Sequence, residues 1–134
     1  MRYVDFAEEH LAGVVGLCEA EGWPTFPADP ARALRVLTAP GVVSVVALED
    51  GAVVGFAQML TDGEIQAFLN LVDVAAAARG RGIATRLVRE AFARSGAQRV
   101  DLLALEDSTG FYRSFTHRTF AGYRVYPESG PSDA

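Results

Sequence analysis

The residues with the clearest potential for chemistry stand at positions 79–84, where the sequence reads Arg-Gly-Arg-Gly-Ile-Ala. They follow a strand-like run that ends at Val74 and precede an amphipathic helical pattern, so the first amides of that helix lack backbone partners. Two glycines let the chain turn tightly and let an anion approach the main chain, while the helix dipole and two arginines favour negative charge. The pattern predicts a phosphate-binding loop suited to a pyrophosphate.

Two other phosphate-binding motifs fit this loop poorly. A dinucleotide-binding fingerprint needs a third small residue near Thr85 or Arg86 in the first strand–helix unit of a parallel sheet, whereas this loop comes late in the chain. A P-loop needs a Gly-Lys-Ser/Thr run, and the sequence contains no lysine. A plain glycine turn with solvated arginines is a weaker interpretation, because two glycines and two arginines in four residues are costly for a mere connection.

The remaining composition excludes several classes of function. Every basic residue is arginine, so Schiff-base chemistry on a lysine is excluded. Cys18 is the only cysteine, and His10 and His117 are far apart in the sequence, which predicts no metal site and no nucleophilic triad. The 12 basic and 17 acidic residues give a net charge of −5, which disfavours nucleic acid and anionic lipid as partners. We expect a small ligand, no membrane span and a cytoplasmic protein.

Hydrophobic periodicity and turn residues divide the chain into alternating elements. The turn dipeptide Asp50-Gly51 predicts a hairpin, and a third strand extends it into an antiparallel meander. The helix from Gly82 to Ser95 should make the next strand parallel to the last one of the meander. The expected strands span residues 2–5, 42–48, 52–60, 65–74, 99–105 and 118–126, and the expected helices lie near residues 11–21, 30–37, 82–95 and 109–115, with a proline-punctuated loop at 23–27.

These elements predict one domain over residues 1–126 and a disordered tail over 127–134, which is rich in proline, serine and glycine. The fold class is α/β (α+β), with a mixed, mostly antiparallel central sheet flanked by helices.

The loop and the order of elements together resemble a known family. Arg79-x-x-Gly82-x-Ala84 after a strand ending in Val74 is similar to the Gln/Arg-x-x-Gly-x-Gly/Ala signature of the GCN5-related N-acetyltransferases (GNAT). The family's order of strand, two helices, three antiparallel strands, signature helix, strand, helix and final strands matches residues 2–126. Phe111-Tyr112 looks like its aromatic-tyrosine pair, whereas Thr116-His117 replaces its usual Gly-Phe pair.

The resemblance implies the GNAT acyl-CoA N-acyltransferase fold with acetyl-CoA as the cofactor. The strand ending at Val74 and the next strand would splay apart, and free backbone groups near Val72 and Val74 would bind the pantetheine arm and polarise the thioester carbonyl. An amide aimed at that oxygen stabilises the charge that develops in a tetrahedral intermediate. The cofactor-binding residues implied are Val72, Val74, Arg79, Gly80, Arg81, Gly82, Ile83, Ala84 and Thr85.

For the catalytic groups, the resemblance implies Tyr112 as a general acid that protonates the departing thiolate. Without the family, Tyr112 would be read as part of an aromatic core stripe with Phe111 and Phe115. The positions where relatives carry a base hold Phe68 and Asn70, which cannot take a proton. The base therefore comes from elsewhere or from ordered water, and the acidic candidates are Glu64, Asp73, Glu19 and Glu21.

The acceptor is expected to be a primary amine of a small molecule or a protein, attacked directly on the thioester. Trp23 and Phe26 lie on the loop that borders the acceptor site in this family and would form an apolar or cation–π wall, or else a hydrophobic cap on the sheet. Asn70 is a third candidate acceptor residue. The alternative function is a non-catalytic coenzyme A-binding sensor or scaffold module. The chain is expected to be a monomer or a homodimer.

Overall fold

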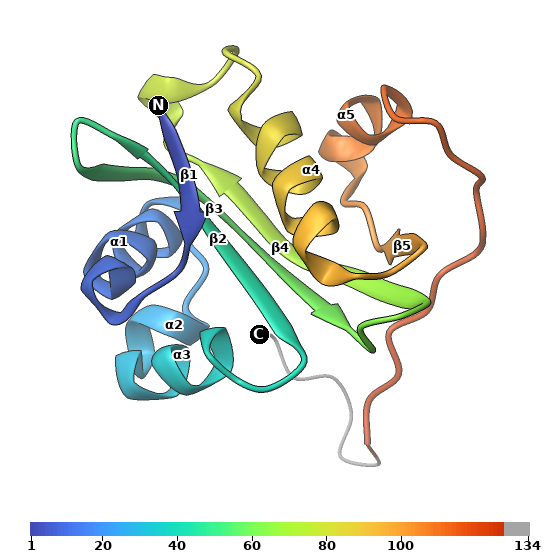
Figure 1. The fold of residues 1–134 in the computed structure, drawn as a ribbon, viewed down its shortest axis with the longest axis horizontal. Helices are drawn as coiled ribbons and strands as arrows, with labels where there is room; N and C mark the ends of the chain where they lie inside the picture. Colours follow the sequence, from blue (N-terminus) through green and yellow to red (C-terminus); the bar gives the residue numbers. More distant parts are fainter. Residues whose placement is uncertain (128–134) are drawn as a thin grey trace.

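The computed structural model describes residues 1–127 of the chain and is built on one five-stranded sheet (Figure 1). The strands follow each other in sequence order from β1 to β5. β1 to β4 are antiparallel neighbours, and β5 pairs with β4 in parallel after the helix α4. The strands are β1 (Arg2–Asp5), β2 (Val42–Glu49), β3 (Ala52–Thr61), β4 (Gln66–Val74) and β5 (Arg99–Leu102).

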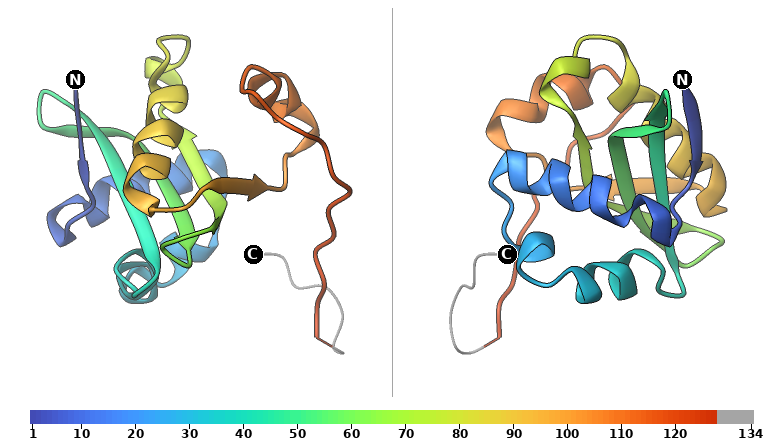
Figure 2. Two further views of the ribbon diagram at one scale, coloured as in Figure 1. Left: turned by 45° about the vertical axis from the view of Figure 1, so that its right-hand side comes forward. Right: turned by 90° about the vertical axis from the view of Figure 1, so that its left-hand side faces the viewer.

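Helices cover both faces of this sheet (Figures 1 and 2). On one face α1, with the buried side chains of Val14, Leu17 and Cys18, packs against β3 and shares a core with Phe26 and Phe56. On the other face α4 packs against β2, β3 and β4. The helices are α1 (Leu11–Glu21), α2 (Thr25–Ala28), α3 (Pro30–Leu37), α4 (Ile83–Ser95) and α5 (Thr109–Arg113), with 3-10 turns at Glu8–His10, Ala76–Ala78 and Glu106–Ser108. The predicted fold class is confirmed.

Local signals explain where the helices begin and end. α1 ends at Gly22, which is left-handed with φ 76° and whose N–H bonds the carbonyls of Cys18 and Glu19. α3 begins after Asp29, whose Oδ1 accepts from the Arg32 N–H at 3.1 Å, and it carries Pro30 in its first turn. The seating of α1 on the sheet depends on Gly13, because a Cβ there would stand 2.6 Å from Cβ of Val53. Only glycine fits that close approach.

The pairing of β4 changes along its length. β3 and β4 shift register between Gln58 and Met59, which face Leu71 and Leu69, so Asn70 is the extra residue of a β-bulge. On the other side β5 pairs with β4 only from Gln66 to Leu69. The end of β4, from Asn70 to Val74, therefore has β3 on one side and no strand on the other within residues 1–127.

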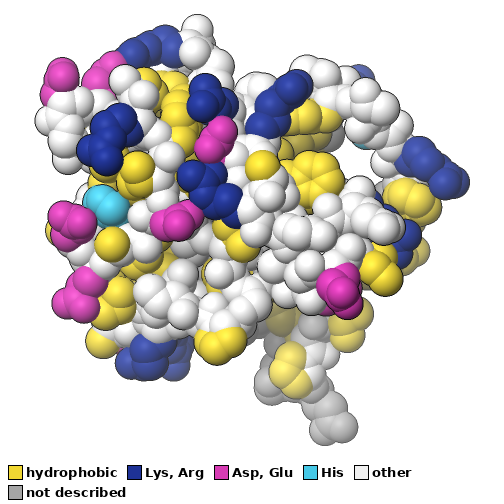
Figure 3. Space-filling model, viewed as in Figure 1, with side chains coloured by type: hydrophobic (Ala, Val, Ile, Leu, Met, Phe, Trp, Pro, Cys, Tyr) yellow, Lys and Arg dark blue, Asp and Glu magenta, His cyan; other side chains and the backbone are white. Residues whose placement is uncertain are grey.

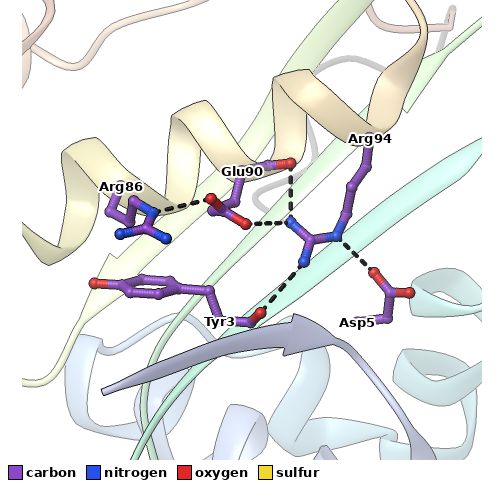
Figure 4. A network of polar contacts seen from close by, with 5 residues as sticks. All are labelled: Tyr3, Asp5, Arg86, Glu90 and Arg94. Atoms are coloured by element: carbon purple, nitrogen blue, oxygen red, sulfur yellow. Dashed lines mark hydrogen bonds and ion pairs between the residues drawn. The ribbon is translucent and has the colours of Figure 1, made fainter.

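A polar network ties the first strand to α4 (Figure 4). Arg94 donates from Nε to Asp5 at 2.8 Å, from Nη1 to Glu90 at 2.9 Å and from Nη2 to the carbonyl of Tyr3 at 3.3 Å. Arg86 bonds the other oxygen of Glu90 at 2.9 Å, and its guanidinium lies 4.7 Å from the centre of the Tyr3 ring. The edge strand β1 is thereby attached to a helix as well as to β2.

Three expectations from the sequence need correction. Residues 25–28, expected in a loop, form the single turn α2, because the Ala28 N–H bonds the Pro24 carbonyl at 3.0 Å and Phe26 is buried in the core. β5 ends at Leu102 rather than at residue 105.

The third correction concerns residues 118–126, which form no strand. The alternation in their sequence is present, but no neighbouring strand supplies the ladder hydrogen bonds that a strand needs. The predicted tail, apart from Pro127, lies outside the described residues.

Candidate active site

The signature residues form a left-handed turn that leads directly into α4. We call residues 79–84 the Gly-Arg loop. Gly80 and Gly82 have φ 77° and 80°, a region that side chains with a Cβ avoid. A Cβ at either position would meet no atom within 4 Å, so backbone conformation, and not crowding, requires glycine there. The tight turn expected from the two glycines is confirmed.

The start of α4 presents free amide donors. The first intrahelical bond runs from the Arg86 N–H to the Gly82 carbonyl at 3.1 Å. The N–H groups of Ile83, Ala84 and Thr85 precede this bond and therefore have no acceptor inside the helix. The Ile83 side chain is buried in the core with Leu87, which fixes the direction of the helix axis. The arrangement can hold an anion at the N-terminus of a helix of 13 residues.

The two arginines of the Gly-Arg loop are both paired with acidic residues. Arg81 forms a two-pronged ion pair with Glu49 at the end of β2, which lowers the pKa of the Glu49 carboxyl and raises that of the guanidinium. Arg79 reaches back to the end of β4, where its Nε donates to the Val74 carbonyl at 3.0 Å. Its Nη2 also pairs with Glu21 and lies 3.8 Å from Asp73. The charges of the two arginines are thus largely balanced by carboxylates, whereas the amides of residues 83–85 have no acceptor inside the helix.

The exposed edge of β4 carries Val72 and Val74. The Ala75 N–H bonds the Val54 carbonyl on β3 at 2.8 Å. Because backbone groups alternate sides along a strand, the N–H groups of Val74 and Val72 point away from β3, toward the side where β5 has already ended. Both N–H groups thus lie on the edge that leads to the Gly-Arg loop. Their side chains belong to the core under α4.

On the opposite face of β4, Asp73 joins a cluster of charged groups. Asp73 is 8 % exposed and lies beside Glu21, at the end of α1, and Arg79. Burial and the neighbouring Glu21 carboxylate raise the pKa of Asp73 to about 7, against the opposing effect of Arg79. Burial, together with the charges of Asp73 and Glu21, also raises the pKa of the Cys18 thiol to about 11, so Cys18 stays neutral and unreactive.

Tyr112 stands on the other side of the sheet, in α5. Its ring packs edge-on against Phe111 with centres 4.8 Å apart, and both rings border the core beneath α4. Burial raises the pKa of the Tyr112 hydroxyl, so it stays protonated at neutral pH. Phe111 in turn contacts Phe115 at 5.4 Å. The aromatic stripe therefore exists, and it includes the tyrosine that the sequence singles out.

The three candidate acceptor residues lie on the face of the sheet that carries α1. Phe26 is 7 % exposed and buried with Phe56, which favours the hydrophobic-cap interpretation over an acceptor wall. Trp23 is half-buried at the edge of the same core. Asn70 is exposed at the bulge, and its Nδ2 donates to Oε1 of Gln58 at 2.7 Å.

Sequence reasoning missed two features of the site. Gln58 is fully buried, and its Nε2 has no hydrogen-bond partner in the described structure. In the sequence, the only indication of this buried polar group is that Gln58 is a single amide side chain within an apolar strand. The meeting of Glu21, Asp73 and Arg79 had no local signal, because the three residues come from separate elements.

Two absences concern the described residues alone. Within residues 1–127, no group of three His, Cys, Asp or Glu side chains is arranged to hold a metal ion. No helix in this part of the chain has the length and apolar character that crossing a membrane requires.

Comparison with known proteins identifies a family. The model of the acetyltransferase (GNAT) family matches residues 8–116, and no curated protein matches the sequence. Among solved structures, aminoglycoside N-acetyltransferase AAC(6')-Iy in complex with CoA is 20 % identical, with 95 % of this chain and 93 % of that chain covered at a TM-score of 0.78.

Two further structures show the same fold. A GNAT-family acetyltransferase from Streptococcus pneumoniae TIGR4 is 25 % identical over 95 % of this chain and 96 % of its own, with a TM-score of 0.73. A ribosomal-protein-alanine N-acetyltransferase from Brucella melitensis biovar Abortus 2308 is 16 % identical over 93 % and 97 %, with a TM-score of 0.74. The chain belongs to the GNAT family and is an acetyl-CoA-dependent acetyltransferase.

Proposed function

We propose that the protein transfers the acetyl group of acetyl-CoA to a primary amine of a small molecule or a protein, by direct attack through a tetrahedral intermediate. One observation carries this proposal: unpaired N–H donors follow the edge of β4 at Val72 and Val74 and continue at the start of α4. Such a row suits a ligand with a thioester at one end and a diphosphate at the other. Acetyl-CoA has this form.

The backbone N–H groups of the Gly-Arg loop and of the first turn of α4 are suited to bind the diphosphate group. The amides of Ile83, Ala84 and Thr85 and the open space above Gly80 and Gly82 would receive its oxygens. Arg79 and Arg81 contribute to the field, but both are paired with carboxylates. The N–H groups of Val72 and Val74 would bind the arm and the thioester carbonyl, where an amide stabilises negative charge as it develops.

Tyr112 and Asp73 are the proposed acid and base. Tyr112 holds its proton at neutral pH and would deliver it to the departing thiolate sulfur. Among the four acidic candidates, Glu64 lies in the exposed turn between β3 and β4, and Glu19 is exposed on α1. Asp73 alone lies on β4 between Val72 and Val74.

Asp73 would take the proton that the attacking amine loses as its nitrogen bonds the acetyl carbon. A carboxylate with a pKa of about 7 is half ionised at neutral pH and holds an accepted proton well. Glu21 is engaged by Arg79, which leaves Asp73 as the proposed base.

The acceptor side is acidic, which suits a cationic amine. Asp73 and Glu21 lie on the face of the sheet that also carries Trp23 and Asn70. A carboxylate cluster attracts an ammonium group, and Trp23 offers it a cation–π surface. Relatives named for aminoglycoside and for ribosomal-protein alanine acceptors support both acceptor classes, small molecule and protein.

The test joins a binding measurement to a rate measurement. Acetyl-CoA should stabilise the protein in a thermal shift, since ligand at a hundredfold excess over Kd adds about 2.7 kcal/mol, while nicotinamide dinucleotide should not. An amine panel should then release free thiol, with a rate that rises with pH through about 7. Asp73→Asn should slow turnover about a hundredfold and remove this rise. Glu19→Gln is the matched control and should keep both.

The alternative function is a coenzyme A-binding sensor or scaffold. It is favoured by Phe68 and Asn70 in the positions where relatives carry a base, and by the bond that ties the Asn70 amide to Gln58. It predicts full thermal stabilisation by acetyl-CoA with no thiol release on any amine. A normal rate in Asp73→Asn would instead keep the enzyme and reject Asp73 as its base.

A further inference from the structure

Gln58 is a buried amide whose two ends have different surroundings. It lies on β3 between Ala57 and Met59, it is fully buried, and its Nε2 has no hydrogen-bond partner in the described structure. An unpaired buried donor lowers stability, and a methionine of similar shape would avoid this loss. Its Oε1, by contrast, accepts from Nδ2 of Asn70 at 2.7 Å. Packing therefore does not account for the glutamine, whereas the bond to Asn70 gives it a role.

The bulge in β4 brings Asn70 to this amide. Ala57 and Met59 belong to the core under α4, so Gln58 between them faces α1. Leu71, its partner across the two strands, packs on the same face. In a regular strand Asn70 would point away from that face, but as the extra residue of the bulge it turns toward Gln58. The Asn70 side chain thus lies on the proposed acceptor side of the sheet.

The bond to Gln58 fixes which end of the Asn70 amide faces outward. Gln58 is buried and Asn70 is exposed, so Nδ2 is turned inward and Oδ1 is the end that a ligand can reach. An amide oxygen accepts hydrogen bonds and donates none. Without Gln58 the amide could rotate and present its NH₂ group instead. Gln58 therefore sets the hydrogen-bonding character of an exposed group.

Asn70 and the proposed base stand apart along β4. Asp73 follows Asn70 by three residues, which at about 3.3 Å per residue is about 10 Å along the strand. One nitrogen atom cannot contact both side chains at this separation. When the attacking amine gives its proton to Asp73, Oδ1 of Asn70 can meet only a different part of the same acceptor.

Charge alone does not select among amines. An acidic group attracts any ammonium ion, and on the side of the molecule drawn in Figure 3 acidic and basic side chains are interspersed. A hydrogen bond is short and directional. An outward amide oxygen can therefore distinguish an acceptor that carries a donor at the right place from one that does not.

We propose that Gln58 is a positioning residue that holds the Asn70 oxygen outward, and that this oxygen selects amines with a second hydrogen-bond donor, a hydroxyl, several bonds from the nitrogen. The inference rests on the proposed transfer to an amine. Asn70 determines specificity by its contact with the acceptor, and Gln58 acts only through Asn70. Because this contact is present in the bound substrate and in the transition state alike, it lowers KM and leaves kcat unchanged.

The first test compares acceptors on the full chain. Acetyl-CoA is supplied with ω-amino alcohols of increasing length, each beside the alkylamine and the amino methyl ether of matching length, and thiol release is followed. At the best length, kcat/KM should be about fivefold higher for the alcohol than for the other two, through KM. The ether accepts hydrogen bonds but donates none. An ether as good as the alcohol would mean that the NH₂ group of Asn70 faces outward, and would overturn the proposal.

The second test uses variants of the two amides. Gln58→Met and Asn70→Leu should each abolish the preference for the alcohol. The double variant should be no worse than Asn70→Leu, because Gln58 acts only through Asn70. Gln58→Met should also melt at a higher temperature than wild type, since the unpaired donor is gone. Gln66→Met, at an amide of the same sheet that bonds Arg99, is the control and should keep the preference.

The outcomes separate this inference from the proposed function. Thiol release on amines without a preference for any alcohol overturns the inference and leaves the proposed function in place. Additive losses in the double variant overturn the positioning role of Gln58, as does a Gln58→Met variant that melts lower and keeps the preference. No thiol release on any amine rejects the proposed function, and the inference with it.

Discussion

At the level of single residues, the proposed acid and the proposed base lie on opposite faces of the sheet. Tyr112 lies with α5 on one face, and Asp73 lies with the end of α1 on the other. Burial raises the pKa of both groups. The Tyr112 phenol therefore stays protonated at neutral pH, and the Asp73 carboxylate can accept a proton near neutral pH. The β4 edge between them is where the proposed thioester would lie.

Replacement of Tyr112 by phenylalanine should remove the proposed acid and keep the ring. We expect kcat to fall about a hundredfold, since general acid catalysis typically contributes at least that much, with little change in the affinity for acetyl-CoA. Tyr3→Phe, in the ring that stacks with Arg86, is the matched control. Steady-state thiol release measures both, and an unchanged rate in Tyr112→Phe would leave the tyrosine as a packing residue.

The raised pKa of Asp73 also predicts how stability depends on pH. An unfolded aspartate has a pKa of about 3.9, so between about pH 4 and 7 the native state holds a proton that the unfolded state has lost. Stability from this group should therefore fall as pH rises through that window and then level off. Asp73→Asn should unfold at higher denaturant concentration than wild type at pH 8, with an advantage of at most a few kcal/mol that vanishes near pH 4. An advantage that did not change with pH would contradict the assignment.

At the level of elements, α4 has two roles. Its apolar stripe fills the core, and its first turn leaves the amides of residues 83–85 without acceptors inside the helix. The turn that makes this possible is left-handed at Gly80 and Gly82. This part of the site could be predicted from the sequence, because glycine conformation and helix starts are local properties. The cluster of Glu21, Asp73 and Arg79 could not, since its members meet only after α1 has packed on the sheet.

Gly82→Ala should test the turn itself. A Cβ there meets no atom, so the expected cost is the left-handed conformation alone, about 1–2 kcal/mol. If the loop straightens to avoid that cost, acetyl-CoA should bind more weakly and give a smaller thermal shift. Gly16→Ala is the control, because Gly16 lies in α1 with equal free space, and alanine there should stabilise the helix by about 0.5–1 kcal/mol.

At the scale of the whole molecule, the sheet has one secured edge and one open edge. β1 is attached to α4 through Arg94, Asp5 and Tyr3, whereas β5 has no second neighbour among the described residues. The prediction of a strand at residues 118–126 was wrong, because this segment does not pair with the open β5 edge in the described structure. Alternating residues such as Phe120 and Val125 favour a strand, but a strand also needs ladder hydrogen bonds to a neighbour.

Loss of the Arg94 contacts should weaken the attachment of β1 to α4. Arg94→Met keeps the apolar stem and removes three donors, and since Asp5 is mostly exposed we expect a loss of about 1 kcal/mol in the free energy of unfolding, smaller at high salt. Arg35→Met, on the exposed side of α3, should have no effect. Urea titrations at low and high salt compare the two variants, and equal midpoints would show that the network contributes nothing.

The close approach of Gly13 to Val53 bears on the proposed acceptor side of the sheet. Gly13 is near one end of α1, and Glu21 and the Trp23 turn are near the other, about 12 Å away at 1.5 Å per residue. A methyl group at position 13 would push the first half of α1 away from the sheet. The resulting tilt of the helix would move Glu21, at its other end, away from Asp73. We therefore expect a substitution at Gly13 to change the proposed acceptor preference from a distance.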